Sequence, residues 1–135
     1  MALTHLNQRG EAHIVDIGDK QATRRRAVAQ ARLEAQPETI DAIMGGALKK
    51  GDALAVARIA GIMAAKKTAE LIPLCHPIPL ASVTVEIAPE GAALVITATA
   101  ETTAQTGVEM EALTAASVAA LTLYDMAKSM DRGMT

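Results

Sequence analysis

A carboxylate and an ammonium group lie three residues apart in an otherwise apolar stretch, at Asp125 and Lys128. At this spacing both side chains share one face of a helix, where they can form an ion pair. The surrounding residues are nearly all apolar, so we expect a helix that is buried on most sides, where charge is costly. On the pair alone, two interpretations stay open: a structural ion pair near a helix end, or an acid–base pair in a functional cleft.

Two further carboxylates, Glu109 and Glu111, stand at the start of the same predicted helix. Thr106 and Glu109 have the spacing of a capping box, and both carboxylates suit the positive helix N-terminus, which is a structural explanation for them. Glu111 lies fourteen residues before Asp125, or about 21 Å along a helix. If both act in catalysis, the pocket must be long, or a second subunit must complete it.

A pair of lysines precedes another predicted helix, in the segment Lys49-Lys50-Gly51-Asp52. Free backbone N–H groups at a helix N-terminus favour anions, and a glycine there permits close approach. Lysines in loops are more often only solvated, so this segment by itself is a weak phosphate site.

The segment Leu74-Cys75-His76 is bounded by prolines at 73 and 77, which stiffen its backbone. Of its side chains we rank His76 above Cys75 for function, because an imidazole can bind phosphate or move a proton. His5, His13, His76 and Cys75 lack the spacing of zinc ligands, so we expect no metal site.

The N-terminal half of the chain must supply elements that position these residues. We expect a short strand from His13 to Ile17, a turn over Gly18–Lys20, and a strand over residues 22–34, where polarity partly alternates. Pro37 should open a short helix that Gly45-Gly46 closes. A long helix is predicted over residues 52–70, with Asp52 as its N-terminal cap.

The C-terminal half begins with prolines at 73, 77 and 79, which require an extended path. Ser82–Ala88 and Ala93–Thr99 alternate in polarity around the turn Pro89-Glu90-Gly91, which predicts a hairpin. Residues 107–130 predict a long final helix. This order indicates an α+β fold, a ferredoxin-like βαββαβ sandwich with an antiparallel sheet covered by helices and with its last strand missing from the given chain.

Composition limits the remaining possibilities. The 135 residues fit one domain, 1–135, whose core must be aliphatic and rich in alanine, because Tyr124 is the only aromatic residue. Such a core gains buried area through subunit contact, so we expect an oligomer. A net charge of −2 disfavours binding to nucleic acid or to an anionic membrane surface. A single cysteine, the lack of a signal peptide and the short apolar runs predict a soluble cytoplasmic protein.

Several segments together closely resemble the cyclic pyranopterin monophosphate synthase family of molybdenum cofactor (molybdopterin) biosynthesis. They are Lys50-Gly51-Asp52, residues 57–62, residues 71–77, residues 106–122 and Tyr124-Asp125-Met126-x-Lys128, with Leu3-Thr4-His5-Leu6 and Val15-Asp16 near the N-terminus. The resemblance covers essentially the whole chain. It implies a lyase that converts 3′,8-cyclised dihydroguanosine triphosphate to a pyranopterin with a cyclic phosphate and releases pyrophosphate, without metal or organic cofactor.

The resemblance also implies site residues and an assembly. Asp125 matches the family's active-site aspartate, Lys128 its catalytic neighbour and Lys50 a further lysine of the site. Substrate-binding segments are matched by the residues Leu74, Cys75, His76, Glu109, Met110 and Glu111. The family assembles as a homohexamer, a trimer of dimers, with active sites at subunit interfaces.

One departure from the family pattern concerns the C-terminus. The family continues with a further strand and a Gly-Gly-Lys-Ser-Gly-like tail that contributes another lysine, and we expect that tail to lie outside the given chain. The alternative to the synthase is a non-catalytic oligomeric anion-binding module of the same fold. Asp125 discriminates between them, because an anion binder gains nothing from a carboxylate in its cleft.

Overall fold

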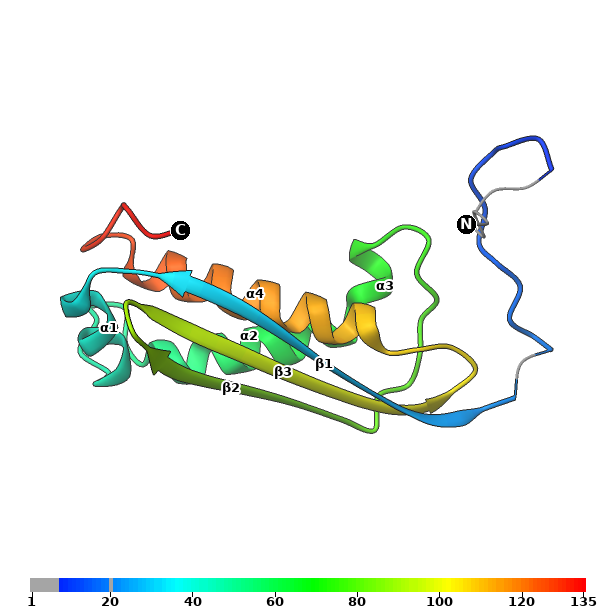
Figure 1. Cartoon of the computed structure of the whole chain (residues 1–135), viewed down its shortest axis with the longest axis horizontal. Helices are drawn as coiled ribbons and strands as arrows, with labels where there is room; N and C mark the ends of the chain where they lie inside the picture. The colour runs from blue at the N-terminus through cyan, green and yellow to red at the C-terminus, as the bar shows by residue number, and fades with distance from the viewer. Residues whose placement is uncertain (1–7, 20) are drawn as a thin grey trace.

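The computed structural model of the chain describes residues 8–19 and 21–135. Three antiparallel strands form one sheet: β1 (Thr23–Glu34), β2 (Ser82–Glu90) and β3 (Ala93–Ala104), in the order β1-β3-β2. The helices are α1 (Pro37–Met44), α2 (Ala53–Lys66), α3 (Thr68–Leu71) and α4 (Glu109–Ala127). The long helices α2 and α4 run side by side along the sheet (Figure 1). No helix in these ranges is long and apolar enough to cross a membrane.

The sheet has one buried and one open face because side chains alternate along each strand. On β1, Ala29 and Leu33 are buried, whereas Arg24, Arg26 and Val28 are exposed on the opposite face. β1 pairs with β3 over its whole length, from Thr23↔Ala104 to Glu34↔Ala93. The alternation in residues 22–34 therefore predicted this strand and its buried face correctly.

The helical layer packs closely because its contact residues are small. A Cβ atom added at Gly61 of α2 would lie 2.9 Å from the carbonyl oxygen of Ala115 in α4 and 3.3 Å from the Ala119 Cβ. Ala112, Ala115 and Ala119 are fully buried. The predicted alanine-rich core is confirmed, and the close approach of α2 and α4 depends on it.

The strand order confirms the predicted α+β fold of ferredoxin-like type, here with three strands. Beyond α4 the chain returns to the sheet, where Glu34 N–H donates to the Thr135 carbonyl at 2.7 Å and Thr135 N–H donates to that of Glu34 at 3.2 Å. Such an exchange is characteristic of an antiparallel pair. Glu34 faces Ala93 of β3, but the backbone N–H and carbonyl of Glu34 bond to Thr135 instead. Thr135 therefore lies along the edge of β1 that faces away from β3.

Two predicted elements, the strand over residues 13–17 and the single helix over residues 52–70, were wrong. Residues 13–17 form no strand, since they lie along a cavity rather than beside a strand edge. The helix predicted over 52–70 is interrupted at Lys67 and continues as the single turn of α3. The buried Thr68 hydroxyl donates to the carbonyls of Ala64 and Ala65, at 3.2 and 2.9 Å, and so competes for the last helical acceptors.

Two predicted local details also differ. The turn of the hairpin lies at Gly91-Ala92 rather than at Pro89-Glu90-Gly91, because Pro89 and Glu90 still belong to β2; Gly91 is in the left-handed region at φ 60°. The capping box at Thr106 and Glu109 is wrong: α4 begins at Glu109 itself, so Glu109 is too early to reach back to a cap. The turn at Gly18-Asp19 is present, with Gly18 N–H donating to Asp16; Lys20 and the family-like segment Leu3–Leu6 lie outside the described residues.

Candidate functional site

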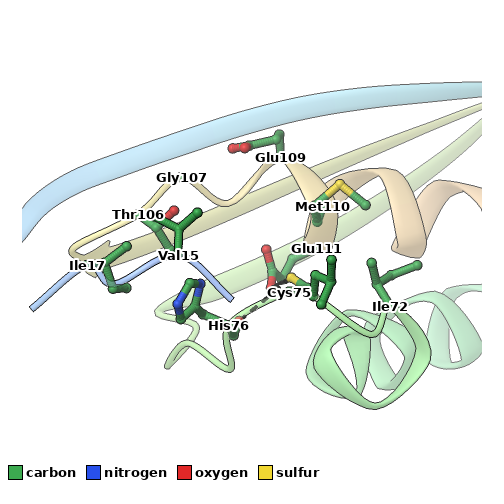
Figure 2. A pocket seen from close by; sticks show the side chains of 11 residues that line it. Val15, Ile17, Ile72, Cys75, His76, Thr106, Gly107, Glu109, Met110 and Glu111 are labelled. Carbon is green, nitrogen blue, oxygen red and sulfur yellow. Dashed lines mark hydrogen bonds between the residues drawn. The ribbon is translucent and has the colours of Figure 1, made fainter. Parts of the chain in front are cut away.

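A cavity of about 380 Å³ lies at the N-terminal end of α4 (Figure 2). Three segments that are distant in sequence form its walls: the residues around Val15, the proline-bounded segment around Cys75, and the loop that leads into α4. All six predicted substrate-binding residues line this cavity, namely Leu74, Cys75, His76, Glu109, Met110 and Glu111. The structure thus brings together both substrate-binding segments.

The carboxyl of Glu111 is the principal acidic group of this cavity, and only 4% of the residue is exposed. Burial raises its pKa above the usual range, and the nearby charge of Glu109 raises it further. The Cys75 thiol lies 3.9 Å from Glu111 Oε2, and the two side chains are neighbours in the cavity (Figure 2). Burial and then these two carboxylates raise the pKa of Cys75, which keeps the thiol protonated and a poor nucleophile.

His76 lies on the same wall as Cys75, with its ring toward Val15 (Figure 2). Its segment is held by a turn in which Cys75 N–H donates to the Ile72 carbonyl at 3.1 Å. Further along, the buried Thr102 hydroxyl of β3 donates to the Pro79 carbonyl. The prolines and these two hydrogen bonds fix the path of the segment, and therefore the position of the imidazole.

A second cluster lies at the other end of α4, where the Asp125 carboxylate sits between two ammonium groups. Lys128 Nζ is 3.1 Å from Oδ1 and Lys50 Nζ is 3.2 Å from Oδ2. Hydrogen bonds from Lys128 and then Lys50 lower the pKa of Asp125 below its usual range. The ion pair predicted between Asp125 and Lys128 is present, and the three predicted catalytic residues lie together.

The surroundings of this cluster differ from the prediction. The Asp125 side chain is 56% exposed, so it is not a charge buried in an apolar setting. The apolar neighbours in the sequence face the sheet and α2, whereas Asp125 projects from the outer side of α4. Because the side chain is exposed, desolvation has little effect on the pKa of Asp125. The two neighbouring lysines determine its properties instead.

Lys50 reaches Asp125 from a loop 75 residues earlier. Gly51 adopts φ 110°, a left-handed conformation that favours glycine, and Leu48 and Gly51 form an isolated bridge. This tight turn precedes α2, whose first turn is capped by Asp52 accepting from Ala55 N–H at 3.2 Å. Lys50 Nζ also donates to the Asp125 backbone carbonyl at 3.0 Å.

The two clusters are separated by most of the length of α4. Glu111 and Asp125 are fourteen residues apart on one continuous helix, which corresponds to about 21 Å. In one subunit the cavity and the lysine–aspartate cluster therefore do not form one site. Sequence reasoning gave this separation correctly, because it depends only on helical rise.

Several cavity residues were not predicted from the sequence to bind substrate: Val15, Ile17, Ile72, Thr106 and Gly107. Val15 and Thr106-Gly107 belong to motifs shared with the resembling family, which was the available signal. Ile72 also belongs to such a motif, within residues 71–77, whereas Ile17 lies outside them and only the fold places it at the cavity. Among the residues that the structure describes, no three His, Cys, Asp or Glu side chains gather as a metal site would require.

The structure is an α+β subunit whose predicted site residues lie at the two ends of one helix. The chain belongs to the MoaC family, whose model matches residues 14–135. It is 62% identical over 134 residues to the cyclic pyranopterin monophosphate synthase of Herpetosiphon aurantiacus, covering 98% of this chain and 82% of that protein. Proteins of the same name from Thermomicrobium roseum and Dinoroseobacter shibae are 58% and 57% identical, each over 98% of this chain and over 81% and 85% of their own lengths.

Proposed function

We propose that this protein is a cyclic pyranopterin monophosphate synthase that acts on 3′,8-cyclised dihydroguanosine triphosphate and releases pyrophosphate. Family membership supports the reaction, and the observation that carries the site assignment is the Asp125 carboxylate held between Lys50 and Lys128. An acid–base step needs groups of both kinds within reach of one substrate, and this cluster supplies them.

The proposed work of the lysine–aspartate cluster follows from its charges. The Asp125 carboxylate can accept a proton from the substrate during ring opening and closure, and the hydrogen bonds from Lys128 and Lys50 lower its pKa. The ammonium groups of Lys50 and Lys128 donate protons and balance the negative charge that develops on departing pyrophosphate. Three charged side chains with a net charge of +1 suit an anionic substrate.

The proposed work of the cavity is to bind the base. The purine-derived ring has N–H groups that can donate hydrogen bonds to the carboxylates of Glu109 and Glu111. Leu74, Cys75 and Met110 provide less polar walls, and His76 is placed to donate to a phosphate oxygen. Because burial raises its pKa, Glu111 holds a proton more readily than an ordinary carboxyl, so it can donate to the ring as well as accept from it.

The assembly proposed with this function is a homohexamer, a trimer of dimers, with active sites at subunit interfaces. The separation of the cavity from the lysine–aspartate cluster supports it, because one subunit cannot offer both to a single substrate. We further propose a cytoplasmic location, which a lone cysteine without disulfide partners favours.

The alternative is an anion-binding module without turnover. The position of Asp125 disfavours it, since a carboxylate between two lysines neutralises part of the charge that would hold an anion. The deciding experiment incubates the purified protein with the cyclised guanosine triphosphate and measures pyrophosphate and the pterin product. We expect both in equal amounts; stoichiometric binding without either product would support the module instead.

A further inference from the structure

A buried carboxylate that the proposed reaction does not use lies just beyond α4, at Asp131. The residue is only 8% exposed. It follows Lys128 by three residues, in a last turn where Asp131 N–H donates to the Ala127 carbonyl at 3.3 Å. Because burial of an ionisable group is costly unless hydrogen bonds compensate it, the partners of this carboxylate explain its position.

Both oxygens of the Asp131 carboxylate accept hydrogen bonds. Oδ2 accepts from the Gln36 backbone N–H at 2.9 Å and from the Thr39 hydroxyl at 3.0 Å. Oδ1 accepts from the Gly133 N–H at 3.1 Å, in the turn that leads the chain back toward β1. The hydrogen bond from Gln36, followed by those from Thr39 and Gly133, lowers the pKa of Asp131 in spite of its burial. This network therefore favours the ionised carboxylate.

Asp131 caps α1 from a distant part of the chain. Gln36 is the N-cap residue of α1, and its side chain makes no capping hydrogen bond. In a capping box, a carboxylate at the third helical position accepts from the N-cap N–H. In α1 that position holds Thr39, whose hydroxyl donates to Asp131 instead. Asp131 thus takes the role of the local carboxylate from 92 residues later in the chain.

This cap joins the two elements that bring ammonium groups to Asp125. Lys128 ends α4, one turn before Asp131, whereas Lys50 lies in the loop that follows α1. α1 and the C-terminal end of α4 lie at the same end of the molecule (Figure 1). The relative position of the two lysines therefore depends on how α1 is attached to the end of α4.

The path from α1 to Lys50 is short and internally bonded. Ala47 N–H donates back to the Ala42 carbonyl of α1 at 2.9 Å. The bridge between Leu48 and Gly51 then holds Lys50 in a tight turn. A shift of α1 relative to α4 is therefore passed on to the Lys50 ammonium group, which must reach a carboxylate on α4.

We propose that Asp131 is a positioning residue for the lysine–aspartate cluster: by capping α1 from the end of α4, it holds Lys50 and Lys128 at the Asp125 carboxylate. Its hydrogen bonds run to the start of α1 and to its own turn, so it acts on the cluster through these elements. The effect on turnover rests on the proposed synthase function, whereas the effect on the position of Lys50 does not.

The Thr39 hydroxyl gives a selective test, because its removal leaves the carboxylate in place. Thr39→Val keeps the shape of the side chain and removes the donor, whereas the matched variant Thr39→Ser keeps the donor. We expect Asp131→Ala to lower kcat by about 10–10²-fold and Thr39→Val by a smaller factor, because misplacement of a catalytic group by about 1 Å is enough for such losses. Thr39→Ser should retain the kcat of the unaltered protein, and KM should change little in all three because the cavity is unaltered.

A merely structural role for Asp131 predicts a different result. Loss of stability alone lowers the amount of folded protein but not kcat per folded molecule, as we expect for Ile96→Val in the buried core. In a Lys50→Met background, Asp131→Ala should lower kcat by a smaller factor than in the unaltered background, since the ammonium group that it positions is gone. Equal factors in both backgrounds, or an unchanged kcat in Asp131→Ala, would overturn the proposal.

Trace labelling measures the position of Lys50 without turnover. Lys50 Nζ donates to Asp125 in the unaltered protein, so brief treatment with acetic anhydride should modify Lys50 faster in Asp131→Ala and Thr39→Val. Mass spectrometry gives the rate relative to Lys66, which is exposed on α2. Unchanged relative labelling of Lys50 in both folded variants would contradict the positioning role. If the unaltered protein shows no turnover, the synthase assignment fails and the labelling alone decides the role of Asp131.

Discussion

Asp125 owes its properties to two lysines rather than to burial. Its side chain is more than half exposed, yet both carboxylate oxygens accept from ammonium groups within 3.2 Å. The hydrogen bonds from Lys128 and Lys50 lower the pKa of Asp125 below its usual range. The lysines in turn are held near the carboxylate, where they remain available as proton donors. The ionised carboxylate is therefore suited to accept a proton at the start of a reaction, and the ammonium groups are suited to donate one.

The Asp125→Asn substitution tests this division of roles. The amide keeps the size of the side chain but cannot accept a proton, so we expect kcat to fall by about 10²–10⁴-fold, as for loss of a general base. Because the side chain is exposed, circular dichroism and native mass should be unchanged. A purified variant that converts the cyclised triphosphate at the full rate would contradict the assignment.

Glu111 should affect stability in a pH-dependent way. Burial raises its pKa in the folded state above the ordinary value of 4.5, so the folded protein binds this proton more tightly than the unfolded chain. Its ionisation therefore lowers stability progressively as pH rises from the ordinary pKa through the raised one, and the full penalty remains above both.

Glu111→Gln removes that ionisation. The difference in melting temperature, variant minus unaltered protein, should be more positive at about pH 8 than at about pH 4. The reason is that burial penalises only the charged form of Glu111, which the variant lacks. Thermal unfolding of both proteins at the two pH values measures the difference. If the relative stability of the variant instead fell as pH rose, the buried carboxylate would be stabilising the fold as an anion.

At the scale of the elements, the contact between α2 and α4 is set by a single glycine. Gly61 allows the α2 backbone to approach the Ala115 carbonyl, with Val85 of the sheet also close. The lysine–aspartate cluster depends on this packing, because Lys50 precedes α2 and Asp125 belongs to α4. A change in the spacing between the helices therefore affects the site as well as the core.

Gly61→Ala is expected to destabilise the protein by about 1–2 kcal/mol, since overpacking of a tight contact outweighs the gain in helix propensity. Urea denaturation of the two proteins measures the difference. A stabilisation of up to about 1 kcal/mol would mean that helix propensity dominates and that the helices separate easily.

At the scale of the whole molecule, the proposed division of the site between two subunits predicts complementation. Asp125→Asn damages the lysine–aspartate cluster and Glu111→Gln damages the cavity, so each homomeric variant should be impaired. After exchange of subunits in an equal mixture, half of the dimers are mixed and each has one intact composite site. About a quarter of all sites should then regain activity.

The matched control is an equal mixture of two variant proteins, Asp125→Asn and Lys128→Met, whose substitutions lie in the same cluster. No mixed dimer of these two variants contains an intact cluster, so activity should stay at the level of the separate variants. Recovery in this control, or none in the first mixture despite demonstrated subunit exchange, would argue against a site shared between subunits.

The sequence by itself determined the positions of most elements and which residues are candidates for function. Alternation in residues 22–34, the cap at Asp52 and the prolines after residue 72 act over a few neighbours, so they can be recognised without the fold. The separation of Glu111 from Asp125 was equally accessible, because it follows from helical rise. The local pattern was wrong about the end of α2, which stops at Lys66, four residues before the predicted end at residue 70. There the Thr68 hydroxyl donates to the carbonyls of Ala64 and Ala65.

Only the tertiary structure decided which of these residues meet. The contact of Lys50 with Asp125 spans 75 residues. Val15 and Ile17 line the cavity, although the local pattern predicted a strand there. The structure also decided that Asp125 is exposed, which no pattern of apolar neighbours could show. Burial and long-range contact depend on how the helices lie on the sheet, and that arrangement results from packing of the whole chain rather than from any segment of it.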